Sequence, residues 1–241
     1  MDAEVSTRHL SFVENGRSRP SQALISRLAR GLQLSPRDEN ALLLTAGFAP
    51  TYRETDFDSL DMAPIRETLK LILDAHAPFS AVVVDRRYDL LMSNGPATRL
   101  TEMLCVDREA VLADGPPNLL RLTFHPKGLR PHIVNWPELA RAVIGRTLRE
   151  ASVEADQATR LLLSQLRAYE GIAEALESLD PSAPLPLLVP TQFRLGEANV
   201  SMVSTITTLG TAHDITLQEL RIETFYPADD ASAALLRAFG T

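Results

Sequence analysis

The sequence is short of cysteine and has no long apolar run. Its one cysteine, Cys105, excludes an internal disulfide and suits a reducing compartment. No stretch approaches the ~20 consecutive apolar residues that a membrane-spanning helix needs, and the pattern of a signal peptide is missing. We therefore expect a cytoplasmic protein without membrane contact.

The sequence also lacks the usual signatures of enzymes. It has no nucleophile elbow, phosphate-binding loop or dinucleotide fingerprint. His125 and His132 have no cysteine or carboxylate at ligand spacing, so a metal site is not expected. Cys105 fits a small buried hydrophobe better than a redox sensor. We predict a protein that is not an enzyme and that uses no metal or cofactor.

The chain is long enough for two domains, and its charge is unevenly distributed. It has 241 residues, 45% of them hydrophobic, which is enough for a real core. The net charge is -7, yet the stretch from Thr7 to Arg37 holds six arginines and only one acidic residue, Glu14. A basic stretch on an acidic protein suits local contact with phosphate and argues against broad coating of nucleic acid.

A short helix and a turn are predicted at the start of the basic stretch. Ser6 is a good N-cap for a helix with Leu10 and Val13 on its apolar side. Asn15-Gly16 then predicts a turn, after which residues 17–20 are expected to be extended.

Two more helices are predicted directly afterwards. The first, from about Ser21 to Arg30, has its apolar residues at helical spacing, and Gly31 is expected as its left-handed C-cap. The second begins at Ser35-Pro36, a cap followed by proline at the first helical position, and ends at Gly47.

This N-terminal stretch resembles the Cro and repressor-like regulators. Their recognition helix and the following turn read V-S-x-x-x-L-S-x-x-E-x-G, then a basic residue and Pro-Ser. The matching residues here are Val5, Ser6, Leu10, Ser11, Glu14, Gly16, Arg17, Pro20 and Ser21.

The resemblance implies binding to DNA. The recognition helix of such a domain reads base edges in the major groove, and the turn after it contacts phosphate. The residues expected to contact base edges are then Thr7, Arg8, His9 and Ser11. The residues expected to contact phosphate are Arg17 and Arg19. The alternative is an ordinary helical hairpin with one solvated face.

The match begins partway into such a domain. A complete domain has two more helices, roughly twenty residues, before the residue that matches Val5. The sequence has only Met1 to Glu4 there. Three explanations stay open: the native protein begins upstream, this form has lost DNA binding, or a partner chain completes the fold.

The rest of the chain predicts a linker and then an α+β domain. A strand hairpin comes first, several helices follow, and three strands in a meander come near the end, an order that builds one five-stranded antiparallel sheet covered by helices, as in PAS-like domains. Asn135 and Glu138 are expected to form a capping box at the start of a long helix. The predicted segments are the linker 48–63, the helix 64–75, the hairpin strands 80–84 and 88–93, a helix from Asn94, helical structure from Asn135 to Leu179 with a break at Gly171, the loop 180–186, strands 187–195, 199–209 and 214–225, and the helix 228–239.

Three further segments are similar to MmyB-like bacterial regulators, which join a helix-turn-helix domain to a PAS-like ligand-binding domain. They are AGFAPTYRET at 46–55, AVVVDRRYDLLMSN at 81–94 and NLLRLTFHPKGLRPHIVNW at 118–136. The resemblance implies a fatty-acid-like ligand. We divide the chain into a partial DNA-binding domain at 1–50, a linker at 51–63 within the irregular segment 48–63, and a ligand-binding domain at 64–241.

A cavity between the sheet and the helices from Asn94 to Ala151 is the expected ligand site. Met92 and Trp136 are candidates for its wall, and Asn94, His125 and Arg130 for contact with a polar head group. The competing interpretation is a filled core, in which His125 braces a loop and Trp136 is simply packed inside.

The sequence thus favours a transcriptional regulator in which an apolar ligand changes the pose or pairing of the DNA-binding segments. The expected partners are DNA, a small apolar ligand and a second copy of the chain, because repressor-like domains read paired half-sites. The alternative is a ligand-binding or interaction protein that does not bind DNA.

Overall fold

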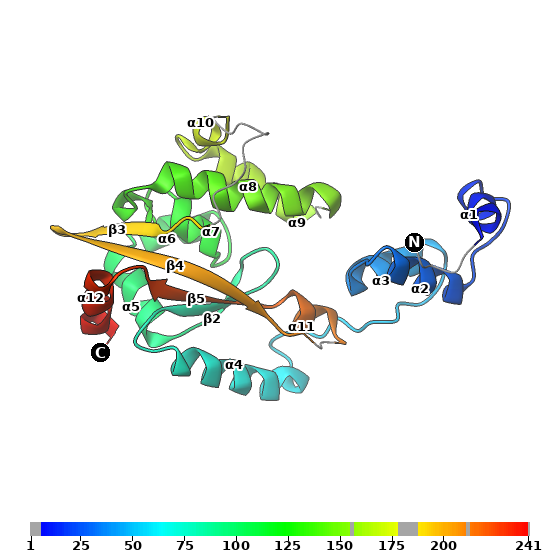
Figure 1. Cartoon of the computed structure of the whole chain (residues 1–241), viewed down its shortest axis with the longest axis horizontal. Coiled ribbons are helices and arrows are strands. Elements are labelled where there is room, and N and C mark those ends of the chain that lie inside the picture. The colour runs from blue at the N-terminus through cyan, green and yellow to red at the C-terminus, as the bar shows by residue number, and fades with distance from the viewer. Residues whose placement is uncertain (1–5, 155–156, 178–187, 211–212, 241) are drawn as a thin grey trace. The chain divides into compact units, whose positions relative to one another are not determined.

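The computed structural model describes residues 6–154, 157–177, 188–210 and 213–240 (Figure 1). They form two compact units. The first comprises the chain up to Ala63 together with Leu209–Glu219, and the second comprises Pro64–Thr208 and Leu220–Thr241. Val5, Leu187 and the predicted loop 180–186 lie outside the described residues.

Three helices follow one another in the first unit, and each begins after a serine N-cap. The hydroxyl of each serine accepts a hydrogen bond from a backbone N–H in the first turn of its helix. These starts, and the turn at Gly16 with φ +67°, confirm the predictions. The helices are α1 (Thr7–Glu14), α2 (Gln22–Gly31) and α3 (Pro36–Thr45), with caps Ser6, Ser21 and Ser35.

The predicted end of α2 is wrong in one detail. Gly31 is not left-handed; it is the last helical residue, and Gln33 takes the left-handed conformation at φ 55°. The turn is closed instead by the backbone bond from Leu34 N to Ala29 O, 2.9 Å long. Gly47, by contrast, follows the end of α3 as expected, and it is left-handed at φ 84°.

The core of the first unit is formed by α2 and α3. Leu24, Ile25 and Ala29 of α2 are buried, and so is Leu43 of α3. Helix α1 has no buried residue, and its predicted core side chains Leu10 and Val13 are only half-buried. The part of this unit that is expected to face DNA is therefore the part with the least packing.

The segment expected to be a linker is fastened to α3. The Asn40 side chain accepts the backbone N–H groups of Thr51 and Tyr52, at 2.9 and 3.1 Å, and donates to the Tyr52 carbonyl at 2.8 Å. A short 3-10 helix, η1 (Leu60–Met62), ends this segment. An irregular sequence pattern here corresponds to a fixed backbone.

Part of the predicted strand 214–225 is wrong, because Ile215–Glu219 forms a short helix, α11. The Asp214 carboxylate accepts bonds from Thr55 Oγ1 at 2.6 Å and from Leu217 N at 3.3 Å, so Asp214 both caps α11 and holds residue 55. The cap formed by Asp214 favours a helix here, although the alternating pattern of the sequence is typical of a strand.

The second unit contains the predicted five-stranded antiparallel sheet. The strand order is β2-β1-β5-β4-β3, so the N-terminal hairpin pairs with the last strand of the C-terminal meander. Val83 of β1, for example, pairs with Met92 of β2 and Ile222 of β5. The strands are β1 (Ala81–Val84), β2 (Leu90–Ser93), β3 (Thr191–Leu195), β4 (Ala198–Thr208) and β5 (Arg221–Pro227).

Helices lie on both faces of the sheet, whereas the order of elements predicted cover on one face. Val82 and Val84 belong to the main core, while Ala81 and Val83, equally buried, point the other way. Figure 1 shows α4 across the sheet from α8 and α9. The helices of this unit are α4 (Ala63–Ala75), α5 (Gly95–Leu104), α6 (Arg108–Ala113), α7 (Leu119–Phe124), η2 (Arg130–His132), α8 (Trp136–Glu154), α9 (Gln157–Ala168), α10 (Ile172–Glu177) and α12 (Asp230–Gly240).

The predicted capping box at α8 is not formed. The Asn135 side chain accepts a bond from Gln192 N at 3.0 Å and donates to Pro190 O at 2.8 Å, so it joins the start of α8 to β3. The predicted break at Gly171 is confirmed, since this residue has φ +76° between α9 and α10.

Asn94 joins three elements of the second unit. Its carbonyl oxygen accepts bonds from Ala81 N and Ala97 N, both at 3.0 Å. Its amide nitrogen donates to Leu73 O at 3.1 Å and Phe79 O at 2.8 Å. All four hydrogen-bonding positions of the side chain are thus used, and Asn94 is buried.

We predict that Asn94→Ala lowers the free energy of unfolding by about 3 kcal/mol, because buried backbone groups lose their partners. Urea unfolding measures this change. The exposed Asn199 of β4 provides a matched control, and Asn199→Ala is expected to stay within about 0.5 kcal/mol of the parent. Equal effects of the two substitutions would contradict the role of Asn94 in joining the three elements.

Candidate ligand-binding site

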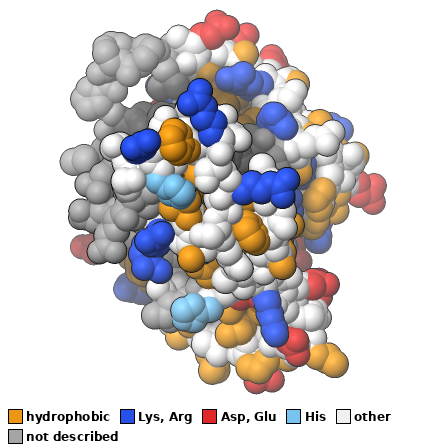
Figure 2. Space-filling model, turned by 90° about the vertical axis from the view of Figure 1, so that its right-hand side faces the viewer, with side chains coloured by type: hydrophobic (Ala, Val, Ile, Leu, Met, Phe, Trp, Pro, Cys, Tyr) orange, Lys and Arg blue, Asp and Glu red, His pale blue; other side chains and the backbone are white. Residues whose placement is uncertain are grey.

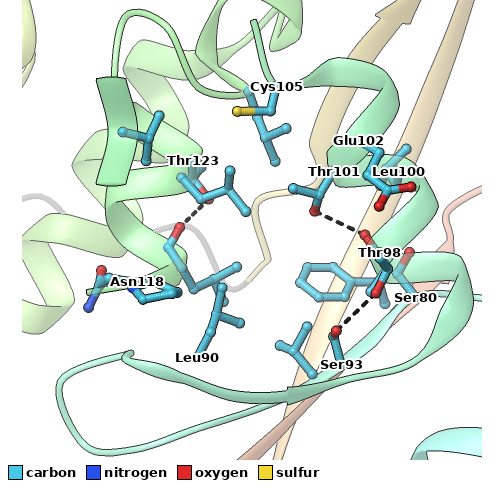
Figure 3. Close-up of a pocket in the computed structure, with 18 of the residues that line it drawn as sticks. Ser80, Leu90, Ser93, Thr98, Leu100, Thr101, Glu102, Cys105, Asn118 and Thr123 are labelled. Carbon is cyan, nitrogen blue, oxygen red and sulfur yellow. Dashed lines mark hydrogen bonds between the residues drawn. The ribbon is translucent and has the colours of Figure 1, made fainter. Parts of the chain in front are cut away.

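A cavity of about 520 Å³ lies in the second unit between the sheet and helices α5, α6 and α7 (Figure 3). We call it the sheet cavity. Its volume is in the range of small-molecule sites. Its lining residues are Ser80, Val82, Leu90, Leu91, Met92, Ser93, Ala97, Thr98, Leu100, Thr101, Glu102, Cys105, Arg108, Val111, Leu112, Pro117, Asn118, Leu119, Leu122, Thr123, Leu129, Thr191, Phe193, Met202 and Phe225.

The walls of the sheet cavity are mostly apolar. Phe193 and Met202 contribute from the neighbouring strands β3 and β4, and both are buried. Ala97 on α5 and Val111 on α6 are buried on the helical side. Side chains of period two on the strands and of helical period on α5 thus meet around one apolar space.

Four hydroxyl groups in the wall, those of Ser93, Thr98, Thr101 and Thr123, already have hydrogen-bond partners. Thr101 donates to Ala97 O at 2.9 Å, Thr123 donates to Leu119 O at 2.7 Å, and the hydroxyls of Ser93 and Thr98 lie 3.0 Å apart (Figure 3). Asn118 is used in the same way, because its side-chain oxygen caps α7 through Leu120 N. A ligand therefore meets few unsatisfied polar groups along these walls.

Two charged residues line the cavity with exposed side chains, Glu102 on α5 and Arg108 at the start of α6. Exposed lining residues mark the solvent side of a cavity, so Glu102 and Arg108 lie where the sheet cavity opens. Sequence reasoning missed Arg108, because it stands among other charged residues without any spacing signal. Cys105 is half-buried and lines the same cavity.

The predicted ligand-binding residues do not gather in one place. Met92 lines the sheet cavity, whereas Asn94 is used entirely in backbone hydrogen bonds. Arg130 and Trp136 lie together at a different cavity, and His125 lines neither. Contact of any of these residues with a ligand stays a prediction.

His125 packs in a polar cluster beside α9. Its Nδ1 accepts the Lys127 N–H at 3.0 Å, and its ring stands edge-on to Tyr169 with centroids 5.0 Å apart. Tyr169 donates to the Asp114 carboxylate at 2.7 Å. Burial lowers the pKa of His125, and burial together with the Asp114 bond raises the pKa of Tyr169. These contacts join the loop before α7 to α9 and support the structural interpretation of His125.

The second cavity has a volume of about 500 Å³ and a different character. Two arginines and a histidine border it, and the one tryptophan of the chain lies in its wall. It is lined by Pro126, Arg130, Pro131, His132, Ile133, Val134, Trp136, Glu170 and Arg194.

The residues predicted to contact DNA are all exposed. Arg8 lies over the Phe12 ring at 5.6 Å, and Ser11 accepts from the Asn15 amide through its backbone and side-chain oxygens. Figure 2 shows several Lys and Arg side chains spread over one face of the molecule among hydrophobic ones. The predicted DNA contacts are Thr7, Arg8, His9 and Ser11 on α1 and Arg17 and Arg19 in the following turn.

Within the described ranges, no three His, Cys, Asp or Glu side chains are grouped so that they could hold a metal ion. None of the helices in the same ranges is both long enough and apolar enough to cross a membrane.

Comparison with known proteins gives one family. Residues 65–239 match the family model of the MmyB-like transcription regulator ligand binding domain. The matched region contains both cavities and all five strands. A comparison with curated proteins finds no match.

The sheet cavity predicts an unusual tolerance of added volume. Ala97→Leu should change the free energy of unfolding by less than about 1 kcal/mol, because the cavity accommodates the added methyl groups. The matched substitution Ala140→Leu, at a fully buried alanine of α8 outside the cavity, should cost about 1–3 kcal/mol. Chemical unfolding measures both, and an equal loss at the two positions would show that the space at Ala97 is filled.

Proposed function

The chain belongs to the family of MmyB-like transcription regulator ligand-binding domains, and from this premise we propose that it regulates transcription in response to an apolar, fatty-acid-like ligand held in the sheet cavity. The family is a class of transcription regulators and not a class of enzymes. The single observation that carries the ligand proposal is the mostly apolar cavity beside the sheet, in which four of the lining hydroxyl groups are already paired.

An acyl chain fits this chemistry. Its transfer from water to an apolar wall contributes about 0.8 kcal/mol per methylene, which supports useful affinity after the entropy of association is subtracted. The head group is expected to lie at the solvent side of the cavity, where Arg108 is the available cation. Met92 would contact the chain of the ligand.

For the first unit we propose DNA binding in the cytoplasm by α1 and the turn after it. The support is the exposure of Thr7, Arg8, His9 and Ser11 on one short helix, next to Arg17 and Arg19. Contacts of the first group would carry sequence preference, and those of the second would carry salt dependence.

Binding to the promoter region of its own gene, with and without fatty acids of about ten to eighteen carbons, tests this function. Affinity is expected to fall steeply between about 50 and about 200 mM salt, and Arg17→Gln should weaken binding and reduce the salt slope by about one. Arg160→Gln, at an exposed arginine of α9, is the control and should change neither.

Two results would contradict parts of the proposal. Absence of salt-sensitive DNA binding, with fatty acids still raising the melting temperature, would favour the alternative of a ligand-binding protein that does not bind DNA. Unchanged thermal stability with all the fatty acids would remove the ligand proposal and leave the DNA proposal standing.

We propose further that the ligand signal reaches the first unit through the connection between β4 and β5. Met202 of β4 and Phe225 of β5 line the sheet cavity, and the connection between these strands, Leu209–Glu219, belongs to the first unit. There Glu219 is held by Arg37 of α3, which donates to it at 2.6 and 3.0 Å and also to Glu54. Hydrogen bonding to Glu219 raises the pKa of Arg37.

Loosening this ion pair should separate ligand binding from its effect on DNA. In Glu219→Gln, fatty acids are expected to raise the melting temperature as before, while their effect on DNA affinity falls severalfold, because a coupling passed through one charged contact is lost with it. Glu197→Gln, in the exposed β3–β4 turn, is the matched control. Full retention of the ligand effect on DNA in Glu219→Gln would exclude this route.

Finally, we propose that the protein acts as a homodimer. Large apolar side chains are exposed in the first unit, among them Phe12, Leu32, Leu42, Leu44 and Leu60. An exposed apolar surface of this kind favours pairing, and paired half-sites require it. A monomer in light scattering at micromolar concentration would contradict this.

A further inference from the structure

The second cavity is built around one arginine stacked on one tryptophan. The Arg130 guanidinium carbon lies 4.0 Å from the centre of the Trp136 ring, a close cation–π contact. Trp136 is the first residue of α8, and Arg130 is the first residue of η2. The short helix η2 and the start of α8 therefore hold the pair in contact.

A glycine makes this stack possible. Gly171 has φ +76°, and a Cβ atom at this position would come within 2.7 Å of the Trp136 ring and 3.6 Å of Arg130 Nη2. Any other residue would push the ring from its place. The break between α9 and α10 thus leaves room for the stack.

The stacked guanidinium has unused hydrogen-bonding capacity. Nη1 of Arg130 is buried and has no partner among the described residues. A buried donor without a partner normally costs free energy, and most such groups in proteins are satisfied. Burial lowers the pKa of Arg130, and the nearby carboxylate of Glu170 opposes this only in part.

The rest of the lining also favours an anion. Arg194 of β3 and His132 of η2 line the cavity, and both carry donors, while Glu170 is the one carboxylate among its described lining residues. Arg194 and Glu170 are exposed, so the cavity is open to solvent on their side. A planar guanidinium matches the two-oxygen face of a carboxylate or a phosphate.

We propose that the second cavity binds a small oxyanion, a carboxylate or phosphate group, between Arg130 and Arg194. The guanidinium of Arg130 is oriented by the Trp136 ring and donates its free N–H groups to the anion. Arg194 supplies the second positive charge from β3. This site is separate from the sheet cavity, and its existence does not depend on the function proposed above.

The sequence provides a direct probe of this site, because Trp136 is the only tryptophan in the chain. Its fluorescence in the intact protein should change saturably when inorganic phosphate or acetate is added at constant ionic strength. Sodium chloride at the same ionic strength is the blank. A response to phosphate alone or to acetate alone identifies the class of oxyanion, and a response to either supports the site.

Substitutions test the two arginines. Arg130→Gln and Arg194→Gln should each weaken the affinity for the responding anion by about tenfold or more. Arg130→Lys should weaken it less, because lysine keeps the positive charge but cannot donate two parallel hydrogen bonds to the anion. Arg194→Gln leaves the stack in place and so remains informative if Arg130→Gln folds poorly. Arg160→Gln, at an exposed arginine outside the cavity, should bind as the parent does.

Three results would overturn the proposal. They are the absence of a saturable change with either anion, an equal change with sodium chloride, and unchanged affinity in Arg194→Gln together with Arg130→Lys. Titration with decanol, which has no carboxylate, separates this site from the sheet cavity: if phosphate or acetate still gives a saturable change in tryptophan fluorescence when decanol is in excess, the two ligands occupy different sites.

Discussion

The second unit depends on the hydrogen bonds of one buried side chain, Asn94. It ties the end of α4, the start of β1 and the first turn of α5 together through four backbone groups. A buried amide can serve two donors and two acceptors at once, which no apolar side chain can do. Because β1 and α5 form two sides of the sheet cavity, Asn94 holds these two walls in place although it does not itself line the cavity.

Strands β4 and β5 give the cavity a physical connection to the first unit. Both strands line the cavity, and their connection is built into the helical unit through Asp214 and Glu219. The Asp214 carboxylate caps α11 and binds Thr55, and Arg37 joins Glu219 to Glu54. The connection between β4 and β5 is therefore the segment of chain through which the proposed signal would travel.

Much of the fold could be predicted from the sequence, because caps, turns and periodicity are local. The serine caps of α1, α2 and α3, the sheet type and the break at Gly171 are examples. Predictions became wrong where a polar side chain had two possible partners: Asn135 binds β3 instead of its own helix, and Asp214 caps a helix within a predicted strand. The Asp214 cap is local and prevails over the alternating pattern, whereas the partner of Asn135 lies in a segment that is distant in sequence. For the same reason the sequence grouped Met92 with Arg130 and Trp136, although the structure places them at different cavities.

The two cavities share short pieces of backbone. Leu129 lines the sheet cavity, and its neighbour Arg130 lines the second cavity. On β3, Phe193 lines the sheet cavity and its neighbour Arg194 lines the second cavity. The two pieces are joined by the bridge between Ile133 and Phe193 and by the bond from Val134 N to Gln192 O at 2.8 Å. An anion that pulls Arg130 and Arg194 together would therefore act on two wall residues of the sheet cavity. Coupling between binding sites is reciprocal. An acyl ligand in the sheet cavity would therefore change the affinity of the second cavity for the anion by the same factor by which the anion changes the affinity for the acyl ligand.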